Sequence, residues 1–272
     1  HIAVVFDTPE PTHRHKIYKE YKETRDAMPE DLQIALPYID RLCGAFMVPA
    51  LRYPGWEADD VIGTLAHTAE NEGFTTYMVT PDKDYAQLVA QNTYMCKPSS
   101  GGGLEILGIP EICELWEIQN TDQVIDILGL MGDASDNIPG VPGIGKKTAQ
   151  KLISEYQSME GVYQHLEELK GKQKENLEAN REKAFFSKEL VTIVRDVPIK
   201  QSLDDLIRKE WNVAAVNELF GELEFATIGR RLLGAEYADI TGALFESGES
   251  VGGMEIKNLD TTEHNYGVAA TA

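Results

Sequence analysis

Eight acidic residues, grouped in four short clusters, are the side chains of this sequence best suited to chemistry. They are Asp7; Glu57, Asp59 and Asp60; Asp82 and Asp84; and Asp133 and Asp136. Carboxylates crowded together repel one another unless cations lie between them. Hard divalent ions take oxygen ligands, so a site of carboxylates alone favours two Mg²⁺ ions, with Mn²⁺ as a substitute. Two such ions about 3.5–4 Å apart can clamp the attacking and leaving oxygens in the hydrolysis of a phosphodiester.

Each acid taken alone also has a simpler structural interpretation. Glu57 and Asp59 could complement the dipole of a helix, and Asp82 could cap one. Spacing favours a shared site, because Glu57 and Asp60 are three residues apart and therefore lie on one face of a predicted helix. The sequence thus predicts catalytic and metal-binding roles for all the residues of the four clusters.

The elements that position these clusters alternate between strands and helices. Short apolar runs predict strands over residues 2–6, 46–51, 75–80 and 89–96, and helical periodicity predicts helices over 32–42, 57–69 and 85–89. This alternation indicates an α/β fold with a parallel sheet and helices on both faces. Since ligands bind at the carboxyl ends of parallel strands, the acids are expected to converge at one edge of the sheet. Beyond residue 110 the sequence predicts only helices, over 121–131, 147–156, 161–169, 177–194 and 213–220.

A glycine-rich turn over residues 137–149 joins two of these helices. Gly140, Gly143 and Gly145 would let backbone N–H groups approach a phosphate, and Lys146, Lys147 and Thr148 open the next helix. The spacing lacks the Walker pattern, so the turn does not indicate a nucleotide-binding loop. It favours a helix–hairpin–helix that holds a DNA backbone without reading its sequence, and a plain helical turn is the alternative.

Residues 13–25 combine cations with aromatic rings. Arg14, Lys22 and Arg25 are suited to phosphate contacts, and Tyr21 to stacking on a base. A solvated charged surface is the alternative interpretation. Because the segment follows Asp7, we expect it to stand over the metal centre.

Composition places limits on the cell compartment and on partners. The formal net charge of -20 argues at first against a nucleic-acid partner, but many acids fall in the clusters above and in residues 236–272. That last segment has paired glycines and little periodicity, so it is interpreted as an acidic linker. Three cysteines without paired metal-ligand spacing indicate free thiols in the cytoplasm, and no apolar run reaches the length of a membrane span.

The motifs together resemble the 5′-nuclease (5′–3′ exonuclease) domain of bacterial DNA polymerase I, within the flap endonuclease superfamily. The matching stretches are Val5-Phe6-Asp7, Tyr18-x-x-Tyr21-Lys22-x-x-Arg25, residues 57–65, Asp82-Lys83-Asp84 and residues 130–145. This resemblance implies a PIN-like core over residues 1–130 with a helical arch at about 10–30. It implies a helix–hairpin–helix with further helices over 131–235, and a linker over 236–272 toward proofreading-type and polymerase domains that are absent here.

The resemblance also implies activity, ligands and partners. It implies two-metal cleavage of DNA at 5′ flaps, nicks and RNA primers during replication and repair. It also implies a monomer in the bacterial cytoplasm, associated with the nucleoid. Asp7, Glu57 and Asp59 would serve the first ion. Asp82, Asp84, Asp133 and Asp136 would serve the second, with Asp59 or Asp60 between the two ions. Arg14, Lys22 and Arg25 would steer the scissile phosphate, and the hairpin could hold a potassium ion.

In one respect the sequence departs from this family. The family's domain begins with an earlier strand that ends in another metal-binding Asp, and nothing in the sequence supplies it. The chain is therefore expected to be an N-terminally truncated fragment. Two other functions stay open: a catalytically inert DNA-binding fragment, and a PIN-domain ribonuclease, which would share the carboxylates but has no reason to carry the glycine hairpin.

Overall fold

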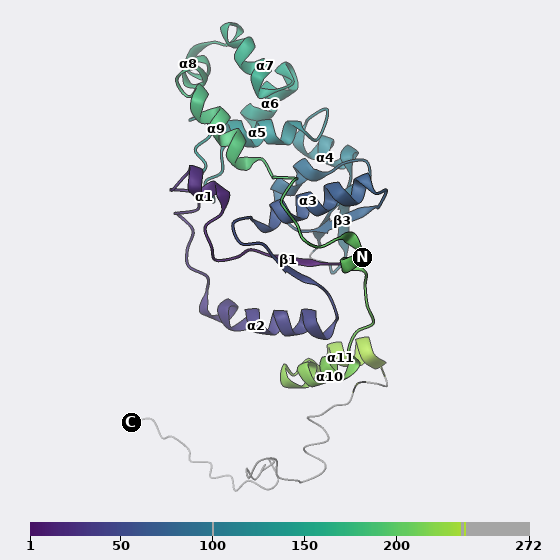
Figure 1. The fold of residues 1–272 in the computed structure, drawn as a ribbon. Helices are drawn as coiled ribbons and strands as arrows, with labels where there is room; N and C mark the ends of the chain where they lie inside the picture. The colour runs from purple at the N-terminus through teal and green to yellow at the C-terminus, as the bar shows by residue number, and fades with distance from the viewer. Residues whose placement is uncertain (100, 235–236, 238–272) are drawn as a thin grey trace, which may run out of the picture. The chain divides into compact units, whose positions relative to one another are not determined.

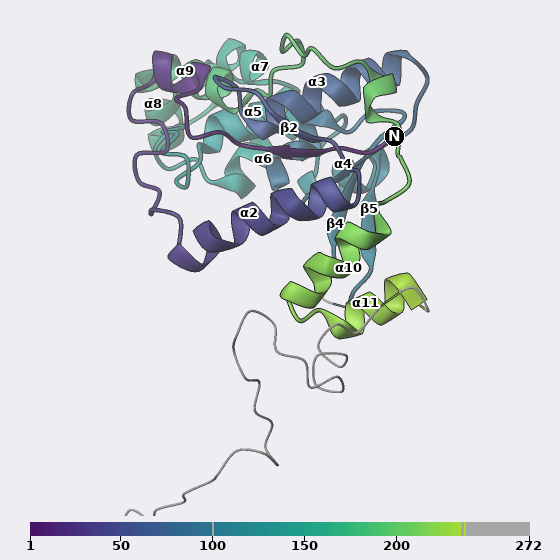
Figure 2. The ribbon, with the colours of Figure 1, turned by 60° about the horizontal axis from the view of Figure 1, so that its bottom comes forward.

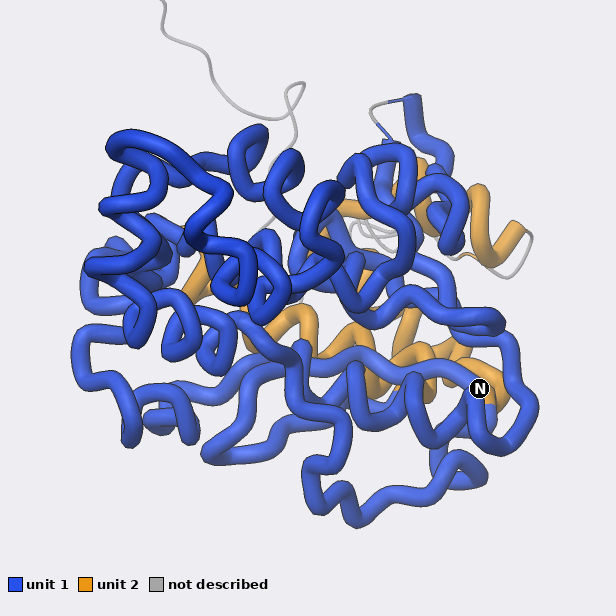
Figure 3. Tube along the Cα trace, turned by 90° about the horizontal axis from the view of Figure 1, so that it is seen from above, with its two compact units in different colours: residues 1–30, 49–207 blue, residues 31–48, 208–272 orange. Residues whose placement is uncertain are grey.

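The computed structural model describes residues 1–99, 101–234 and 237. It divides into two compact units, one of residues 1–30 and 49–207 and the other of residues 31–48 with those from 208 onward (Figure 3). The predicted linker over 236–272 lies outside the described residues except for Tyr237. Among the described residues, no helix is long and apolar enough to cross a membrane.

The larger unit is an α/β structure, as the sequence predicts. Its strands are β1 (Val4–Phe6), β2 (Ala50–Arg52), β3 (Thr76–Val79), β4 (Thr93–Pro98) and β5 (Leu104–Leu107). Its helices are α1 (His13–Ile17), α3 (Ala58–Asn71), α4 (Ile109–Trp116), α5 (Gln123–Met131), α6 (Lys146–Tyr156), α7 (Met159–Gln164), α8 (Gly171–Ala179) and α9 (Arg181–Val191), with the 3-10 helices η1 (Lys83–Leu88), η2 (Leu166–Glu168) and η3 (Leu203–Leu206). Figure 1 shows α5 to α9 gathered at one end of this unit.

The strands form two sheets where the sequence predicts one. β1 pairs with β2 in parallel, with Val5 opposite Leu51, and Figure 2 shows the two strands side by side. β3 and β4 are also parallel, but β5 returns antiparallel to β4 through a turn in which Gly102 has a φ of +83°. β5 was not predicted, because its short run is flanked by glycines and reads as a loop. Helix α3 contacts both β1 and β3.

An apolar groove separates the two sheets. It has a volume of about 550 Å³ and is lined by residues 1–5 before and within β1, residues 74–79 up to the end of β3, Ile62, Leu65, Ala66 and Ala69 of α3, and Leu203 and Leu206. In the described residues β1 has β2 as its neighbour and β3 has β4, so each strand keeps a free edge. The parallel sheet is therefore interrupted between β1 and β3.

Helix α5 is the centre of the helical part of the larger unit. Val124, Ile127, Leu128 and Leu130 are fully buried there, which gives the helix an apolar surface around most of its circumference. It contacts α6, α7, α9 and η1, so it is enclosed on several sides. The five stretches that periodicity predicts after residue 110 are helical, although 161–169 is divided between α7 and η2, and 177–194 between α8 and α9 at Asn180. Helices α4 and α11 were not predicted.

The smaller unit consists of α2 (Glu30–Ala45, from residue 31), α10 (Val213–Glu222) and α11 (Ala226–Leu233). Its core contains Ala45, Val216, Phe220 and Leu233. Asn212 N–H donates to the carbonyl of Ala45 at 2.8 Å, and Arg41 pairs with Glu222. Residues far apart in the sequence thus form one helical group, which periodicity alone does not indicate.

Candidate metal centre and nucleic-acid contacts

The N-terminus of α3 brings the first acidic clusters together. Glu57 is the N-cap of this helix and is 5% exposed. The carboxylate of Asp7, at the end of β1, accepts a hydrogen bond from the N–H of Ala58 at 2.7 Å. Carboxylates are favoured at a helix N-terminus because the unpaired N–H groups there carry partial positive charge. Asp7, Glu57 and Asp59 therefore lie around one helix end.

Asp60 is engaged inside the protein, which corrects its predicted role. It is 0% exposed, and Arg14 donates to its two oxygens at 2.8 and 2.9 Å. The N–H groups of Glu57 and Val194 also donate to Asp60, at 3.2 and 2.9 Å. A carboxylate that already accepts four hydrogen bonds has little capacity left for a metal ion.

The structure also corrects the prediction that Arg14 contacts DNA. Its side chain is 2% exposed, and besides binding Asp60 it donates to the carbonyls of Leu190 and Thr192. Burial by itself would lower the pKa of Arg14, but the hydrogen bonds to Asp60 raise it. Arg14 is thus a structural tie between α1, α3 and the end of α9.

Tyr21 joins carboxylates from two elements. Its hydroxyl lies 3.1 Å from Glu57 Oε2 and 3.1 Å from Asp136 Oδ2. Because the residue is 3% exposed, its ring does not face solvent, which corrects the prediction that it stacks on a base. Burial and then the charges of Glu57 and Asp136 raise the pKa of Tyr21, so the hydroxyl keeps its proton and can donate it.

Lys22 and Arg25 are the cations of this part of the site. Lys22 Nζ lies 2.7 Å from Glu57 Oε2 and 3.9 Å from Asp136 Oδ2, while Arg25 Nη2 lies 2.5 Å from Asp136 Oδ1. Burial would raise the pKa of Glu57, but Lys22 and Arg14 hold it below its ordinary value. The segment after α1 therefore neutralises carboxylates from α3 and from the loop after α5.

A second group of acids surrounds Lys83. Asp82 is the N-cap of η1 and accepts from the N–H of Asp84 at 3.0 Å, so both acids stay at one turn. Lys83 Nζ lies 2.5 Å from Asp133 Oδ2 and 3.8 Å from Asp84 Oδ1. Burial would raise the pKa of Asp133, but hydrogen bonds from Lys83 and Ser135 lower it. The sequence analysis included Lys83 in a motif but assigned it no role. Its position between Asp82 and Asp84 in the sequence is the signal that could have predicted its pairing with acids.

Acids of both groups act on one buried tyrosine. Burial and then the charges of Asp59, Asp82 and Asp7 raise the pKa of Tyr85. These three acids come from the first turn of α3 and from the ends of β3 and β1, and α3 contacts both strands.

The acids of this region are of the chemical kind that binds a divalent cation. Among the described residues Asp84 Oδ1 is buried and has no hydrogen-bond partner. Burial, together with Asp82 and Asp133, raises the pKa of Asp84 to about 7, and burial raises that of Asp59 to about 7. Carboxylates in such a setting need compensating positive charge, and oxygen donors suit a hard divalent ion. Within the described ranges, however, no three His, Cys, Asp or Glu side chains are grouped so that they could hold an ion, and lysine and arginine groups pair with several of them instead.

The glycine hairpin presents an exposed helix start. Gly143 has a φ of +80° and is exposed, as are Gly145, the N-cap of α6, and the next residues Lys146 and Lys147. Lys146 lies over the ring of Trp116, 4.5 Å from its centroid, and Lys147 pairs with Glu117. Thr148 is half-buried in the first turn. The hairpin thus ends in an exposed helix N-terminus with two lysines, a type of site that favours phosphate groups.

Gly140 has a structural part in the hairpin, which corrects its prediction as a DNA contact. It is buried, and its N–H donates to Ser187 Oγ at 3.0 Å. A Cβ at this position would stand 2.4 Å from the backbone nitrogen of Gly132, so no larger residue fits. Gly140 closes the hairpin onto the end of α5.

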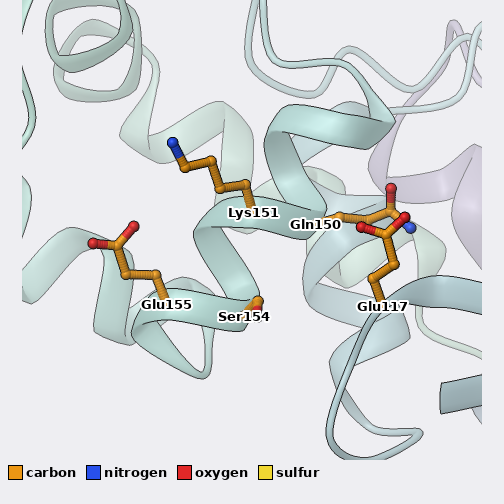
Figure 4. A pocket seen from close by; sticks show the side chains of 5 residues that line it. All are labelled: Glu117, Gln150, Lys151, Ser154 and Glu155. Carbon is orange, nitrogen blue, oxygen red and sulfur yellow. The ribbon is translucent and has the colours of Figure 1, made fainter. Parts of the chain in front are cut away.

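A small hollow lies on the same helix as the hairpin's lysines. It has a volume of about 310 Å³, and Figure 4 shows the side chains that line it: Glu117, Gln150, Lys151, Ser154 and Glu155. Gln150 donates to the carbonyl of Trp116 at 2.7 Å and is buried. The hollow contains none of the predicted site residues.

Comparisons with known proteins point to one family. The N-terminal resolvase-like domain of 5'-3' exonucleases matches residues 1–117, and their C-terminal SAM fold matches residues 119–214. DNA polymerase I of Caldicellulosiruptor bescii is 41% identical over 85% of this chain and 28% of that protein, and DNA polymerase I of Bacillus subtilis is 39% identical over 85% and 26%. The chain thus spans little more than a quarter of the length of these relatives.

Solved structures show the same fold. The T5 D15 protein co-crystallised with metal ions has a TM-score of 0.57 and 25% identity, over 70% of this chain and 73% of that one. The bacteriophage T5 D15 flap endonuclease in complex with DNA and metal ions has a TM-score of 0.58 and 21% identity, over 88% and 82%. The catalytic core of Rad2 with a DNA substrate has a TM-score of 0.51 and 16% identity, over 80% and 73%.

Proposed function

Since this chain belongs to the 5'-3' exonuclease family, we propose that it is the metal-dependent 5′-nuclease part of a DNA polymerase I. Its reaction is the hydrolysis of phosphodiester bonds at 5′ flaps, nicks and RNA primers in DNA replication and repair. Polymerase activity belongs to the longer relatives, and for the whole protein it is part of the same proposal.

One observation supports this proposal: in one unit, which also carries the glycine hairpin, carboxylates from separate chain segments are linked in pairs. Asp7 reaches the N-terminus of α3, Tyr21 connects Glu57 to Asp136, and Lys83 connects Asp84 to Asp133. A PIN-domain ribonuclease would need the acids but not the hairpin. An inert DNA-binding module would need the hairpin but not the acids.

The acids divide between two cation positions. Asp7, Glu57 and Asp59 would hold one divalent ion, and Asp82, Asp84, Asp133 and Asp136 would hold the other, with Mg²⁺ as the ion and Mn²⁺ as its substitute. When bound, the ions supply charge neutralisation for the attacking and leaving oxygens of the phosphodiester. Asp60 is assigned to neither ion, because both of its oxygens already accept hydrogen bonds from the buried Arg14.

Other residues of the chain bind and orient the DNA. Gly143, Gly145, Lys146, Lys147 and Thr148 contact the backbone of the duplex, in the way that helix N-termini bind phosphates. Lys22 and Arg25 are placed beside the carboxylates and steer the scissile phosphate toward them. A potassium ion on the carbonyls of the hairpin would add to this contact. The protein acts as a monomer in the cytoplasm, at the nucleoid.

The groove between β1 and β3 offers a place for the additional strand that the family resemblance implies. Both neighbouring strands run parallel to their own partners and keep a free edge toward the groove, whose lining is mostly apolar. A strand there would continue the sheet from β2 through β1 to β3 and would end beside Asp7 and Asp82.

Cleavage of a labelled 5′-flap duplex tests the proposed function. We expect cutting with Mg²⁺ and none with EDTA. The double variant Asp82→Asn with Asp84→Asn should lose cleavage and keep duplex binding, because it removes proposed metal ligands and leaves the hairpin residues unchanged. Equal loss of cleavage and binding would contradict the metal role of these acids.

A single-stranded RNA run beside the flap separates the alternatives. Cutting of the RNA alone would favour the PIN-domain ribonuclease, and binding without cutting would favour the inert module. Glu155→Gln, in the hollow on α6, is a suitable control, since Glu155 is exposed and lies outside both proposed sites.

A further inference from the structure

Residues 20–25 are fastened to the candidate metal centre by contacts that use its own ligands. Lys22 binds Glu57, and Arg25 binds Asp136. Two backbone contacts support these ion pairs: Lys22 N–H donates to the carbonyl of Asp136 at 3.0 Å, and Asn137 Nδ2 donates to the carbonyl of Glu20 at 2.8 Å. All of these residues belong to the larger unit.

Lys22 has a strained backbone within the fastened segment. Its φ is +58°, in the left-handed region that side chains with a Cβ rarely adopt. Such a conformation persists only where surrounding contacts impose it. Releasing the ion pairs would let Lys22 return to a common backbone conformation.

The charges on the two sides of the contact are matched. Glu57 and Asp136 carry two negative charges, and Lys22 and Arg25 carry two positive ones. A divalent cation would need the same carboxylate oxygens, including Glu57 Oε2, which lies 2.7 Å from Lys22 Nζ. The ammonium and a metal ion cannot share this oxygen at close range without strong repulsion.

We propose that residues 20–25 form a latch in which Lys22 and Arg25 take the place of metal ions on Glu57 and Asp136, and that a divalent cation opens it. This inference depends on the proposed metal role of Glu57 and Asp136. The latched form keeps the carboxylates neutralised in the absence of metal. In the open form the cationic groups of Lys22 and Arg25 are released and become available to a DNA phosphate, so metal binding also prepares the DNA site.

Competition for the carboxylates gives the latch a measurable signature. Lys22→Met and Arg25→Met each remove a competing cation, so each should bind Mg²⁺ roughly tenfold more tightly in titration calorimetry without DNA. Lys22→Arg should keep the affinity of the unchanged protein. Lys19→Met is the matched control, because Lys19 is an exposed cation just before the latch with no ion pair among the described contacts. The Mg²⁺ affinity of this variant should differ from that of the unchanged protein by less than about twofold.

Hydrogen exchange tests the opening itself. Amides of residues 20–25 should exchange faster with Mg²⁺ than with EDTA at equal ionic strength, and Lys22→Met should exchange fast in both. Calorimetric Mg²⁺ binding without any change in exchange would overturn the latch and leave the metal site intact. Equal affinities for Lys22→Met and Lys19→Met would also overturn it. If the unchanged protein binds no Mg²⁺, the latch and the proposed metal site both fail.

Discussion

Arg14 and Asp60 form an ion pair that is almost wholly removed from water, with side chains 2% and 0% exposed. Their partners include the carbonyls of Leu190 and Thr192 and the N–H of Val194, so the pair connects the start of the chain to the end of α9. A buried pair of this kind adds little stability over an apolar pair, but the loss of one member leaves a buried charge without compensation.

Replacing Arg14 therefore tests whether this residue is structural. We expect Arg14→Met to lower the free energy of unfolding by about 3–5 kcal/mol, measured by urea denaturation. Lys16→Met, at an exposed position of the same helix, should change it by less than about 0.5 kcal/mol. If Arg14→Met were instead as stable as the unchanged protein but bound DNA more weakly, the prediction that Arg14 contacts a phosphate would be supported.

At the scale of elements, α5, α7 and α9 are tied by one partly buried cation. Lys188 of α9 lies 2.6 Å from Asp126 of α5 and 2.8 Å from Glu160 of α7. Burial raises the pKa of Asp126 despite its pairing with Lys188. Burial would also raise the pKa of Glu160, but hydrogen bonding to Lys188 lowers it. Lys188 thus offsets the cost of burying the charges of both acids between the packed helices.

The signs of these pKa shifts predict a pH dependence for Lys188→Met. At neutral pH the variant should lose about 1–3 kcal/mol of stability, because Asp126 and Glu160 lose the cation that offsets the cost of burying their charges. The loss should shrink as the pH falls. Asp126, whose pKa is raised, becomes protonated and then no longer needs a cation. The pair of Lys188 with Glu160 stabilises only above the lowered pKa of Glu160, so at lower pH the unchanged protein loses this stabilisation as well. Thermal unfolding between neutral and acidic pH measures this, with the exposed Lys183→Met as the control.

At the same scale, the two lysines at the start of α6 can be tested as contacts to the DNA backbone. Lys146→Ala with Lys147→Ala should weaken duplex binding and reduce the slope of log affinity against log salt by roughly 1–2, because each lysine displaces counterions from the DNA. Lys151→Ala, farther along the same helix, should leave the slope unchanged. Fluorescence anisotropy over a range of KCl concentrations gives both slopes, and an unaltered slope in the double variant would count against the hairpin contact.

At the scale of the whole molecule, the interrupted sheet of the larger unit is the main weakness of the fold. The groove of about 550 Å³ exposes apolar side chains of both sheets, including Tyr77 and Val79 on β3. Apolar surface left in contact with water forgoes roughly 25 cal/mol per Å² of stabilisation. Free strand edges also leave backbone groups without partners.

Supplying a strand should therefore stabilise the protein. An apolar pentapeptide fused ahead of His1 through a Gly/Ser linker of about 20 residues is long enough to cross over and lie parallel to β1. We expect a higher melting temperature and less binding of an apolar dye such as anilinonaphthalene sulfonate. The same linker ending in Gly and Ser residues should have neither effect, and equal melting temperatures for the two fusions would show that the groove does not accept a strand.

Much of the function and the outline of the fold follow from the sequence, because they depend on local patterns. Apolar runs and helical spacing indicate β1, β3, α3, α5 and α6, since burial on one face imposes these periods. Acid spacing marks the carboxylates of the metal centre, because charge crowding is visible in the residue types themselves. The hairpin of Gly143, Gly145, Lys146 and Lys147 is likewise local.

The tertiary structure alone decides which of the predicted site residues are already hydrogen-bonded to residues far away in the sequence. The sequence predicts that Arg14 contacts a phosphate and that Asp60 binds a metal ion. In the structure these two residues, 46 positions apart, are buried and hydrogen-bonded to each other. Tyr21 reads as a stacking ring, yet Glu57 and Asp136 take its hydroxyl. Hydrogen-bond saturation, burial and the break between β1 and β3 arise from contacts across the chain, and local periodicity carries no information about such contacts.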